Sequence, residues 1–405
     1  MFVSKRLLFI YVSIAVLVLA LSQCSDFKSK KAADIRGLAY ADPQSCANCH
    51  KNLERSFSET SHFHTSAEMN ELSKELPHAD SSYWFNDSLK VIVTKRKKRM
   101  YQATWYGNKE IESHRFDIAI GSGEKARSYA YWNEDQLFQL PLTYYRSLNK
   151  WTNSPGFPVG EADYKRAIVS RCFECHSSFA KTRISKTGSL SVSETVVKGS
   201  VLYGIDCQRC HGPAAAHVAF HQKNPEEKTA RHITAIRSLS RQQKVDMCAV
   251  CHSGNDQATQ QATFAFKPGD TLSNYYFPQY SHSGKEPDVH GNQYGMLARS
   301  ACFIKSQMDC SSCHNTHLNE KNDSALFTQR CLSCHDTATH PSSAMLSKKA
   351  ISSNCIDCHM PVQPSKLISF QLAGKNTKTP YLLRSHRIAV YPEETKKILS
   401  YLKSR

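Results

Sequence analysis

Cys46-Ala-Asn-Cys49-His50 is the first of seven copies of one pattern in this 405-residue sequence, in which a histidine directly follows the second of two cysteines separated by two residues. The other six copies are Cys172-Phe-Glu-Cys175-His176, Cys207-Gln-Arg-Cys210-His211, Cys248-Ala-Val-Cys251-His252, Cys310-Ser-Ser-Cys313-His314, Cys331-Leu-Ser-Cys334-His335 and Cys355-Ile-Asp-Cys358-His359. Of the 16 cysteines, only Cys24 and Cys302 lie outside the pattern. The frequencies of Cys and His in the chain predict on the order of 0.03 such strings by chance, so the repetition reflects a chemical requirement.

The pattern is the attachment signature of a c-type haem. Two thiols add to the vinyl groups of the haem, and the adjacent imidazole is held under the iron as its proximal ligand. The sequence therefore predicts seven covalent haems, numbered here 1 to 7 in chain order, with all the motif cysteines as attachment points. The predicted proximal ligands are His50, His176, His211, His252, His314, His335 and His359. Zinc ribbons and disulfide scaffolds also use paired cysteines, but neither requires the histidine.

The formal net charge of +17 does not indicate a nucleic-acid partner. Seven haems would add roughly fourteen propionate charges, partly offset by the ferric ions, so the loaded protein would be only moderately basic. The excess lysine and arginine is therefore expected to pair with propionates and to cover the surface. Long amphipathic helices are few, so packed haems are expected to supply much of the core, and the chain should not fold properly without them.

The N-terminus has the features of an export signal. Lys5 and Arg6 precede an apolar stretch, residues 7–21, that is short for a membrane span. The following Leu21-Ser22-Gln23-Cys24 looks like a bacterial lipoprotein cleavage box, although Gln23 departs from the usual small residue. Residues 1–23 are thus predicted to be a lipoprotein signal peptide and Cys24 the lipidated residue. An uncleaved anchor helix and a plain signal peptide are the alternatives.

The interval between haems 1 and 2 changes to a period-two pattern. Alternating residues at 89–93 and 100–105 predict antiparallel strands. Asn133-Glu134-Asp135 supplies turn residues between residues 129–132 and 137–140, which predicts a second hairpin. The aromatic residues of this interval are expected to lie in its core. Near the end of the chain, Pro392 is expected to open a short helix.

The predicted fold class is therefore mainly α with much irregular structure, a multihaem cytochrome c fold organised around seven covalent haems with a small antiparallel β insert. The predicted segments are the signal peptide at 1–23, a tether and haem 1 segment at 24–76, the β-rich insert at 77–165, a haem 2–4 segment at 166–260, an aromatic-rich connection at 261–300 and a haem 5–7 segment with the C-terminal helix at 301–405.

Four further stretches carry a resemblance to a known group. They are Thr60-Ser61-His62 after the first motif, Ile120-Gly121-Ser122-Gly123 with Gln139-Leu140-Pro141, Cys210-His211-Gly212-Pro213 with His217, and Cys358-His359-Met360-Pro361. Together with the seven motifs, they resemble the multihaem cytochromes related to cytochrome c-554 and hydroxylamine oxidoreductase, particularly the lipoprotein forms of Bacteroidetes-like bacteria. The resemblance covers nearly the whole mature chain. It implies an electron carrier, or a reductase or oxidase of small nitrogen or sulfur compounds.

The resemblance also implies that many of the irons carry a second, distal histidine. The histidines at positions where related chains carry a ligand are His62, His217, His290, His317 and His386; His340, His282 and His221 come next, and His64, His78, His114 and His232 are weaker candidates. For each of them, a surface or propionate-bound imidazole is the alternative. Met296, Met308 and Met360 lie near motifs, but a methionine beside apolar residues is more often part of a core.

The distal ligands decide the class of function. An iron with two strong protein ligands has no site for a substrate and only transfers electrons, whereas an open iron can bind and convert one. No motif ends in lysine, which is the mark of the pentahaem nitrite reductases, and nothing local identifies the tyrosine cross-link of hydroxylamine oxidoreductase. A plain motif can still hold a five-coordinate haem, so whether the chain is an enzyme stays open.

The first hypothesis is an electron carrier, lipid-anchored on the periplasmic side of a bacterial membrane, with the outer membrane as one candidate. Its expected partners are redox proteins, namely a membrane quinol oxidase or other cytochromes. The second hypothesis is an enzyme that reduces or oxidises a small nitrogen or sulfur compound at one five-coordinate haem. A haem-based sensor or a structural lipoprotein has little support, because seven haems exceed what sensing one ligand requires.

The motif count gives a direct prediction. Intact mass of the exported protein should show seven added haems, and a pyridine haemochrome assay should give the same number per chain, because each motif provides both thiols and the ligand. Exported protein without added tetrapyrroles would contradict the assignment of the motifs.

Overall fold

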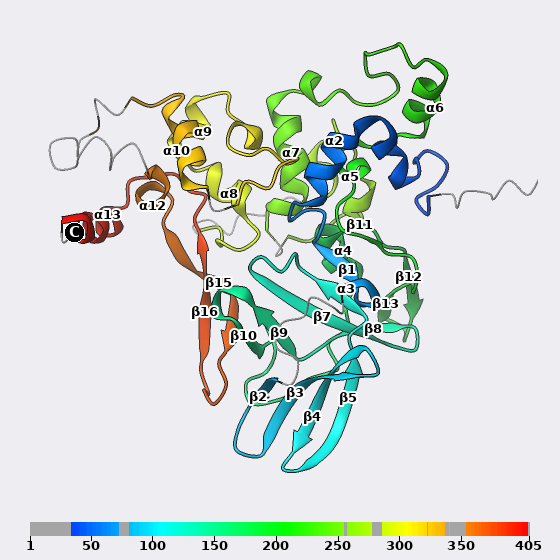
Figure 1. Cartoon of the computed structure of the whole chain (residues 1–405), viewed down its shortest axis with the longest axis vertical. Coiled ribbons are helices and arrows are strands. Elements are labelled where there is room, and N and C mark those ends of the chain that lie inside the picture. Colours follow the sequence, from blue (N-terminus) through cyan, green and yellow to red (C-terminus); the bar gives the residue numbers. More distant parts are fainter. Residues whose placement is uncertain are drawn as a thin grey trace, which may run out of the picture.

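A computed structural model describes residues 34–72, 81–254, 257–277, 286–321, 323–336, 340 and 354–403 (Figure 1). Helices make up 30% of the structure and strands 27%. The prediction of a mainly α fold is therefore wrong. Strands occur well outside the predicted insert, in segments where pairing with distant parts of the chain, more than local alternation, fixes the extended conformation. The predicted signal peptide and Cys24 lie outside the described residues.

The larger sheet has eight antiparallel strands and is assembled from widely separated segments. Its order is β1 (Ser66–Glu68), β6 (Ile118–Ile120), β7 (Ala126–Asn133), β9 (Leu142–Tyr145), β10 (Lys150–Asn153), β15 (Val362–Gln371) and β16 (Lys378–Arg384), with β8 (Gln136–Gln139) paired to β7. The pairing of Asn153 with Gln371 joins β10 to β15. A segment that follows the last haem motif thus completes a sheet that begins shortly after the first.

A second sheet is a four-stranded antiparallel meander of β2 (Ser81–Trp84), β3 (Leu89–Arg96), β4 (Arg99–Tyr106) and β5 (Lys109–Arg115). The β3–β4 turn consists of Lys97 and Lys98, both at positive φ, as a two-residue hairpin turn that matches the strand twist requires. The β7–β8 hairpin turns at Glu134, also at positive φ. Both predicted hairpins are confirmed.

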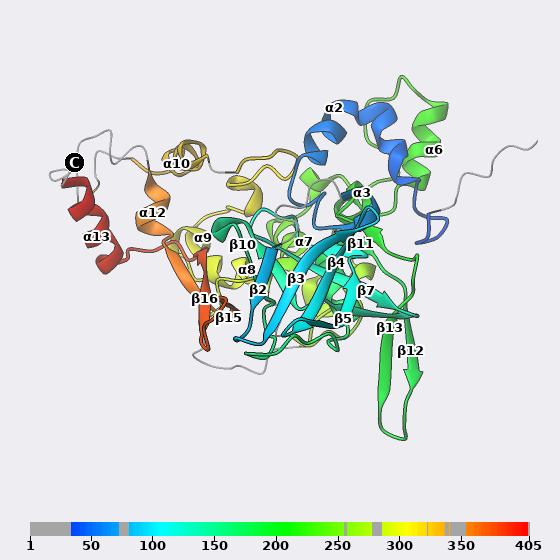
Figure 2. The same cartoon turned by 60° about the horizontal axis from the view of Figure 1, so that its bottom comes forward.

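Two further hairpins extend from the haem 2–4 region. Strand β11 (Ser177–Phe179) pairs with β14 (Leu202–Tyr203), and between them β12 (Thr182–Lys186) pairs with β13 (Val192–Val196). In Figure 2 the β12–β13 hairpin projects as an arm away from the body of the molecule.

The helices are mostly short and gather on one side of the sheets (Figure 1). They are α2 (Ala47–Ser58), α3 (Met69–Leu72), α4 (Ser170–His176), α5 (Cys207–His211), α6 (Ala215–Lys223), α7 (Arg241–His252), α8 (Gln293–Leu297), α9 (Ala301–Lys305), α10 (Ser324–Leu332), α12 (Cys355–His359) and α13 (Pro392–Lys403). The 3-10 turns are η1 (Pro43–Cys46), η2 (Arg146–Leu148), η3 (Ile236–Ser238), η4 (Thr263–Ala265), η5 (Leu272–Asn274) and η6 (Cys310–Ser312). The C-terminal helix predicted at Pro392 is confirmed. Within the described ranges, no helix has the length and apolar character that crossing a membrane requires.

The largest apolar cluster is built from side chains of both sheets and is rich in aromatic residues. Tyr129 of β7 lies with its ring centre 4.5 Å from that of Phe116 and 5.5 Å from that of Trp151. Tyr83 and Phe85 from the meander belong to the same cluster and are almost fully buried. The expectation that the aromatic residues between haems 1 and 2 form a core is confirmed. This part of the protein has a side-chain core of its own.

Gln102 fixes the meander to the larger sheet. It is fully buried on β4, and its amide Nε2 donates to the Leu142 carbonyl at 2.9 Å while its Oε1 accepts from the Leu142 N–H at 2.8 Å. These two bonds give partners to the N–H and the carbonyl of Leu142, which have no partner strand on that side of β9. One side chain therefore replaces a pair of sheet hydrogen bonds.

Replacing Gln102 with Ala should lower the free energy of unfolding by about 2–4 kcal/mol, because two buried backbone groups lose their partners. The measurement is urea denaturation of the haem-loaded protein, followed by far-ultraviolet circular dichroism. Gln136→Ala, on the exposed part of β8, is the control and should change stability by less than about 0.5 kcal/mol. Equal effects of the two substitutions would contradict the bridging role.

Candidate haem sites

Each motif occupies about one helical turn, which places its two thiols and its imidazole on one face. Motifs 2, 3, 4 and 7 lie in α4, α5, α7 and α12, while motif 1 spans η1 and α2, motif 5 begins in η6 and motif 6 begins in the last turn of α10. Two of these turns start with a capping side chain: Asp206 before α5 and Asn354 before α12. The caps hold the turns that carry the thiols. Ser240 caps the start of α7, whose C-terminal end carries motif 4.

Five motif histidines each lie opposite a second imidazole. The ring centres are 6.0–6.5 Å apart in all five pairs, which are His50–His217 at 6.5 Å, His252–His62 at 6.2 Å, His211–His317 at 6.0 Å, His314–His386 at 6.4 Å and His359–His340 at 6.1 Å. Four of the five second histidines are those favoured by the family resemblance, and His340 is the next candidate.

These separations fit a metal ion between the rings. Metal–imidazole bonds are about 2.0–2.1 Å long, so two imidazoles on opposite sides of one ion have ring centres roughly 6 Å apart. Rings in direct stacking contact lie closer, as shown by His114 and Tyr131 at 3.8 Å. The gap between the paired histidines is therefore wide enough for the plane of a haem and its iron.

His176 and His290 lie near each other. The two imidazoles interact electrostatically, and the Nδ1 atoms of both are buried without a hydrogen-bond partner. His290 follows Asp288, whose carboxylate accepts from the His290 N–H at 2.8 Å and thereby fixes the backbone there. The fifth favoured histidine thus also lies near a motif histidine.

Hydrogen bonds orient several of the rings. His217 Nδ1 lies 2.8 Å from the Arg231 carbonyl oxygen, His359 Nδ1 lies 3.0 Å from the Ala389 carbonyl oxygen, and His252 Nδ1 lies 3.1 Å from Oε1 of Gln293. A bond of this kind fixes the tautomer in which Nε2 carries the free lone pair. Nε2 of these rings is thereby available for iron.

Burial keeps several of the imidazoles neutral. Burial, together with the effect of neighbouring imidazoles, lowers the pKa of His62, His176 and His386 to about 4. Burial also lowers the pKa of His211, His290 and His314. A neutral imidazole is the form that binds a metal ion, so the environment of these rings suits ligation without a change of protonation.

The remaining histidine candidates lie elsewhere. His64 packs against Phe63, His232 packs against Phe220, and His114 stacks on Tyr131 beside Glu112. His221 lies on α6 beside His217, with the two ring centres 4.6 Å apart. His78 and His282 lie outside the described residues. Of the methionines near motifs, Met296 is buried in the fold.

His335 differs from the other motif histidines. It is exposed, and among the described residues no second imidazole lies opposite its ring. The chain directly after it, at 337–339 and 341–353, is outside the described part.

The cysteines of the described chain form no disulfides with one another. A zinc ribbon needs four converging ligands, and the described residues contain no group of three or more Cys, His, Asp or Glu side chains arranged for a metal ion. The geometry that is present, two thiols and an imidazole on one turn with a second imidazole facing the first, fits haem c.

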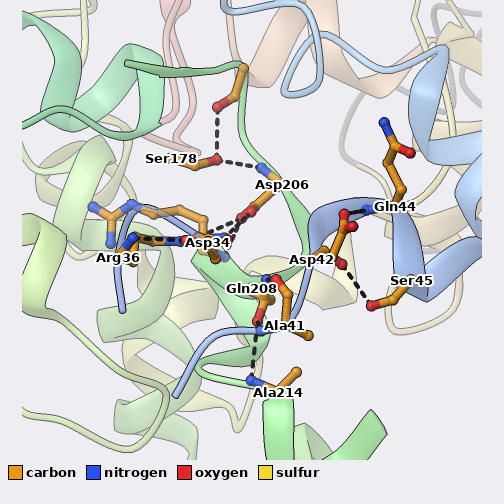
Figure 3. Close-up of polar contacts among 12 residues, drawn as sticks. Asp34, Arg36, Ala41, Asp42, Gln44, Ser45, Ser178, Asp206, Gln208 and Ala214 are labelled. Carbon is orange, nitrogen blue, oxygen red and sulfur yellow. Dashed lines mark hydrogen bonds and ion pairs between the residues drawn. The ribbon is translucent and has the colours of Figure 1, made fainter. Parts of the chain in front are cut away.

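A buried polar network ties the N-terminal segment to the third motif (Figure 3). Arg36 donates to both carboxylate oxygens of Asp206, at 3.1 and 2.5 Å, and also to Asp34. Gln208, inside the third motif, bonds both the N–H and the carbonyl of Ala41 at 2.8 Å. The two residues between the motif cysteines were not identified from the sequence as structural. Only their burial beside a distant segment reveals their role.

The backbone around His62 is also fixed by the third motif. The N–H of Ile205 donates to the His62 carbonyl at 2.9 Å. Gly204 has a φ of +66°, and a Cβ there would lie 2.0 Å from the carbonyl oxygen of Phe63. Only glycine fits this close approach.

Asp206→Ala should lower the free energy of unfolding by about 2–4 kcal/mol, because it removes the cap of α5 and two charge-assisted bonds to Arg36. Asp323→Ala removes only a cap, the bond from the Leu326 N–H to its side chain, and should cost about 1 kcal/mol. Denaturant titration of both variants gives the comparison. A loss at Asp206 no larger than that at Asp323 would show that the ion pair adds nothing.

Two comparisons with known proteins point to the same cofactor, although no curated protein matches the sequence. Residues 324–364, which contain motifs 6 and 7, match the family described as the doubled CXXCH motif. Among solved structures, the fold is similar to that of the outer cell wall cytochrome OcwA, with a TM-score of 0.53, 16% sequence identity, and coverage of 89% of this chain and 81% of that chain. The doubled motif and the shared fold together support a multihaem c-type cytochrome.

Proposed function

We propose that this chain is an exported electron carrier that holds seven haems c, each attached through the two cysteines of one motif. It is of the type related to cytochrome c-554 and hydroxylamine oxidoreductase, and it is lipid-anchored through Cys24 on the periplasmic side of a bacterial membrane. A membrane quinol oxidase or other cytochromes are its proposed partners. The similarity in fold to an outer cell wall cytochrome supports a location outside the cytoplasm.

The observation that carries this proposal is the pairing of imidazoles across a gap of 6.0–6.5 Å. Bound haem supplies the one-electron couple of its iron. With haem bound, each paired histidine would hold one face of that iron, and neither face would be left for a substrate. Such a centre would accept and pass on electrons without binding other molecules.

The protein tunes the centres through burial and orientation. Burial around His62, His176 and His386 excludes water from the ligands, and exclusion of water is one of the factors that set a reduction potential. The carbonyls that accept from His217 and His359 increase the basicity of those rings. The centres are therefore expected to differ in potential along the protein.

His62→Ala should convert one ferric haem from low spin to high spin, because haem 4 loses its second ligand. Electron paramagnetic resonance of the oxidised protein measures the change. His64→Ala is the matched control two residues away, where the ring packs on Phe63, and it should leave the spin state of every haem unchanged. The same spectrum for both variants would refute the assignment of His62.

A second candidate function is attached to haem 6. His335 is exposed and has no facing imidazole in the described part of the chain, which favours an iron that can take an external ligand. Such an iron would reduce or oxidise a small nitrogen or sulfur compound, with its electrons supplied by the neighbouring haems.

The wild-type protein provides the test. If haem 6 is open, one high-spin ferric signal is present and cyanide or nitrite converts it with a stoichiometry of one per chain. If all seven irons are low spin and cyanide changes nothing, the chain is a carrier alone.

A further inference from the structure

We propose that six of the seven haems form one file in the order haem 1, 3, 4, 5, 6, 7, with haem 2 beside the file at haems 3 and 4. This inference rests on the proposed binding of a haem at every motif. It follows from which motif turns pack against each other, from contacts between cysteines of different motifs, and from the arrangement of the helices in space.

Haems 1 and 3 are placed together by the packing of η1 against α5. The thiol of Cys46 lies against that of Cys207, so the proposed attachment points of the two haems are adjacent. His217, which faces His50 of motif 1, follows motif 3 by a few residues. The N-terminal motif is therefore adjacent to the third motif and not to the second.

Haem 4 is the junction. Helix α7 packs against both α4 and η6, the turns of motifs 2 and 5. Its two motif cysteines reach in opposite directions, since Cys251 lies against Cys175 of motif 2 and Cys248 against Cys310 of motif 5. The Glu174 carbonyl of motif 2 accepts from both Arg209 of motif 3, at 3.2 Å, and the Cys251 thiol, at 3.6 Å. Three motifs thus meet the fourth.

Motif 2 lies beside motifs 3 and 4. Phe173 and Glu174 inside it are buried, whereas Cys172 is exposed and His176 is half-buried with its Nδ1 enclosed. Arg209 of motif 3 donates to the Glu174 carbonyl at 3.2 Å, and Thr263 donates to its carboxylate at 3.1 Å. Haem 2 is therefore placed as a branch beside haems 3 and 4.

Haems 5, 6 and 7 continue the file in chain order. Arg330 of α10 donates to the Cys313 carbonyl of motif 5, and the ring of Phe327 lies 5.3 Å from that of His314. Helix α10 packs against α12, which places Cys331 of motif 6 beside Cys355 of motif 7.

The arrangement of the helices agrees with this order. In both views, α2 with α6 lies at one end of the helical layer, α7 in the middle, and α10 and α12 towards the other end (Figures 1 and 2). Motif 1 at one end has an exposed Cys49, and α12 at the other is only partly buried. Both ends of the proposed file are therefore accessible to redox partners.

The direct test is the structure of the haem-loaded protein. Haem edges should be closest for the pairs 1–3, 2–3, 3–4, 2–4, 4–5, 5–6 and 6–7. A haem 2 placed next to haem 1, or a haem 4 without three neighbours, would overturn the order. Fewer than seven haems would instead refute the proposed function, so the two failures are distinguishable.

A kinetic test uses one haem at a time as an electron trap. His217→Met, His62→Met and His290→Met should raise the potentials of haems 1, 4 and 2 respectively, because methionine ligation raises a haem's potential. A photoreductant is attached either to Lys223→Cys on α6 or to Lys396→Cys on α13, both exposed positions, in a Cys302→Ser background. Transient absorption then reports when the trap is reduced.

From the α6 label, the trap at haem 1 should fill before the trap at haem 4, and from the α13 label the order should be reversed. From the α13 label, the trap at haem 2 should fill after the trap at haem 4. The same order of haems 1 and 4 from both labels, or a haem 2 trap that fills before the haem 4 trap from the α13 label, would overturn the proposal.

Discussion

The gap of 6.0–6.5 Å between facing imidazoles is the constraint on which the helical layer depends. The second histidine of a pair comes from another motif's surroundings: His217 follows motif 3 and faces motif 1, His317 follows motif 5 and faces motif 3, and His62 follows motif 1 and faces motif 4. Each short segment in this proposed ligation serves two haems. In the proposed ligation, shared metal centres would hold these short helices in place of a conventional side-chain core.

The sheets, by contrast, are stabilised by side-chain packing and hydrogen bonds. Their core is made of side chains such as Tyr129, Trp151 and Phe116, and hydrogen bonds such as those of Gln102 join one sheet to the other. Strands β1 and β15 enter the larger sheet from segments next to the first and last motifs. The two ends of the haem-bearing chain are therefore anchored to one rigid framework.

Local patterns were enough to predict part of this structure. The β3–β4 and β7–β8 hairpins follow from alternation and turn residues, whereas the five favoured histidines came from the family resemblance. The fold class could not be predicted in the same way, because the β15–β16 hairpin joins the larger sheet through the pairing of Gln371 with Asn153, more than two hundred positions earlier. Nor could the partner of each histidine, since sequence spacing does not determine which motif lies opposite. His340 ranked below the favoured set although it faces His359.

Gly204 shows how closely the two kinds of order are joined. It sits three residues before the first cysteine of motif 3, at a φ of +66°, and its missing side chain lets the backbone of Phe63 approach. His62, which precedes Phe63 in the chain, is the proposed ligand of haem 4. The absence of a side chain at Gly204 therefore fixes the proposed ligand of haem 4 relative to the proposed attachment cysteines of haem 3. Any side chain at this position would disturb both proposed centres.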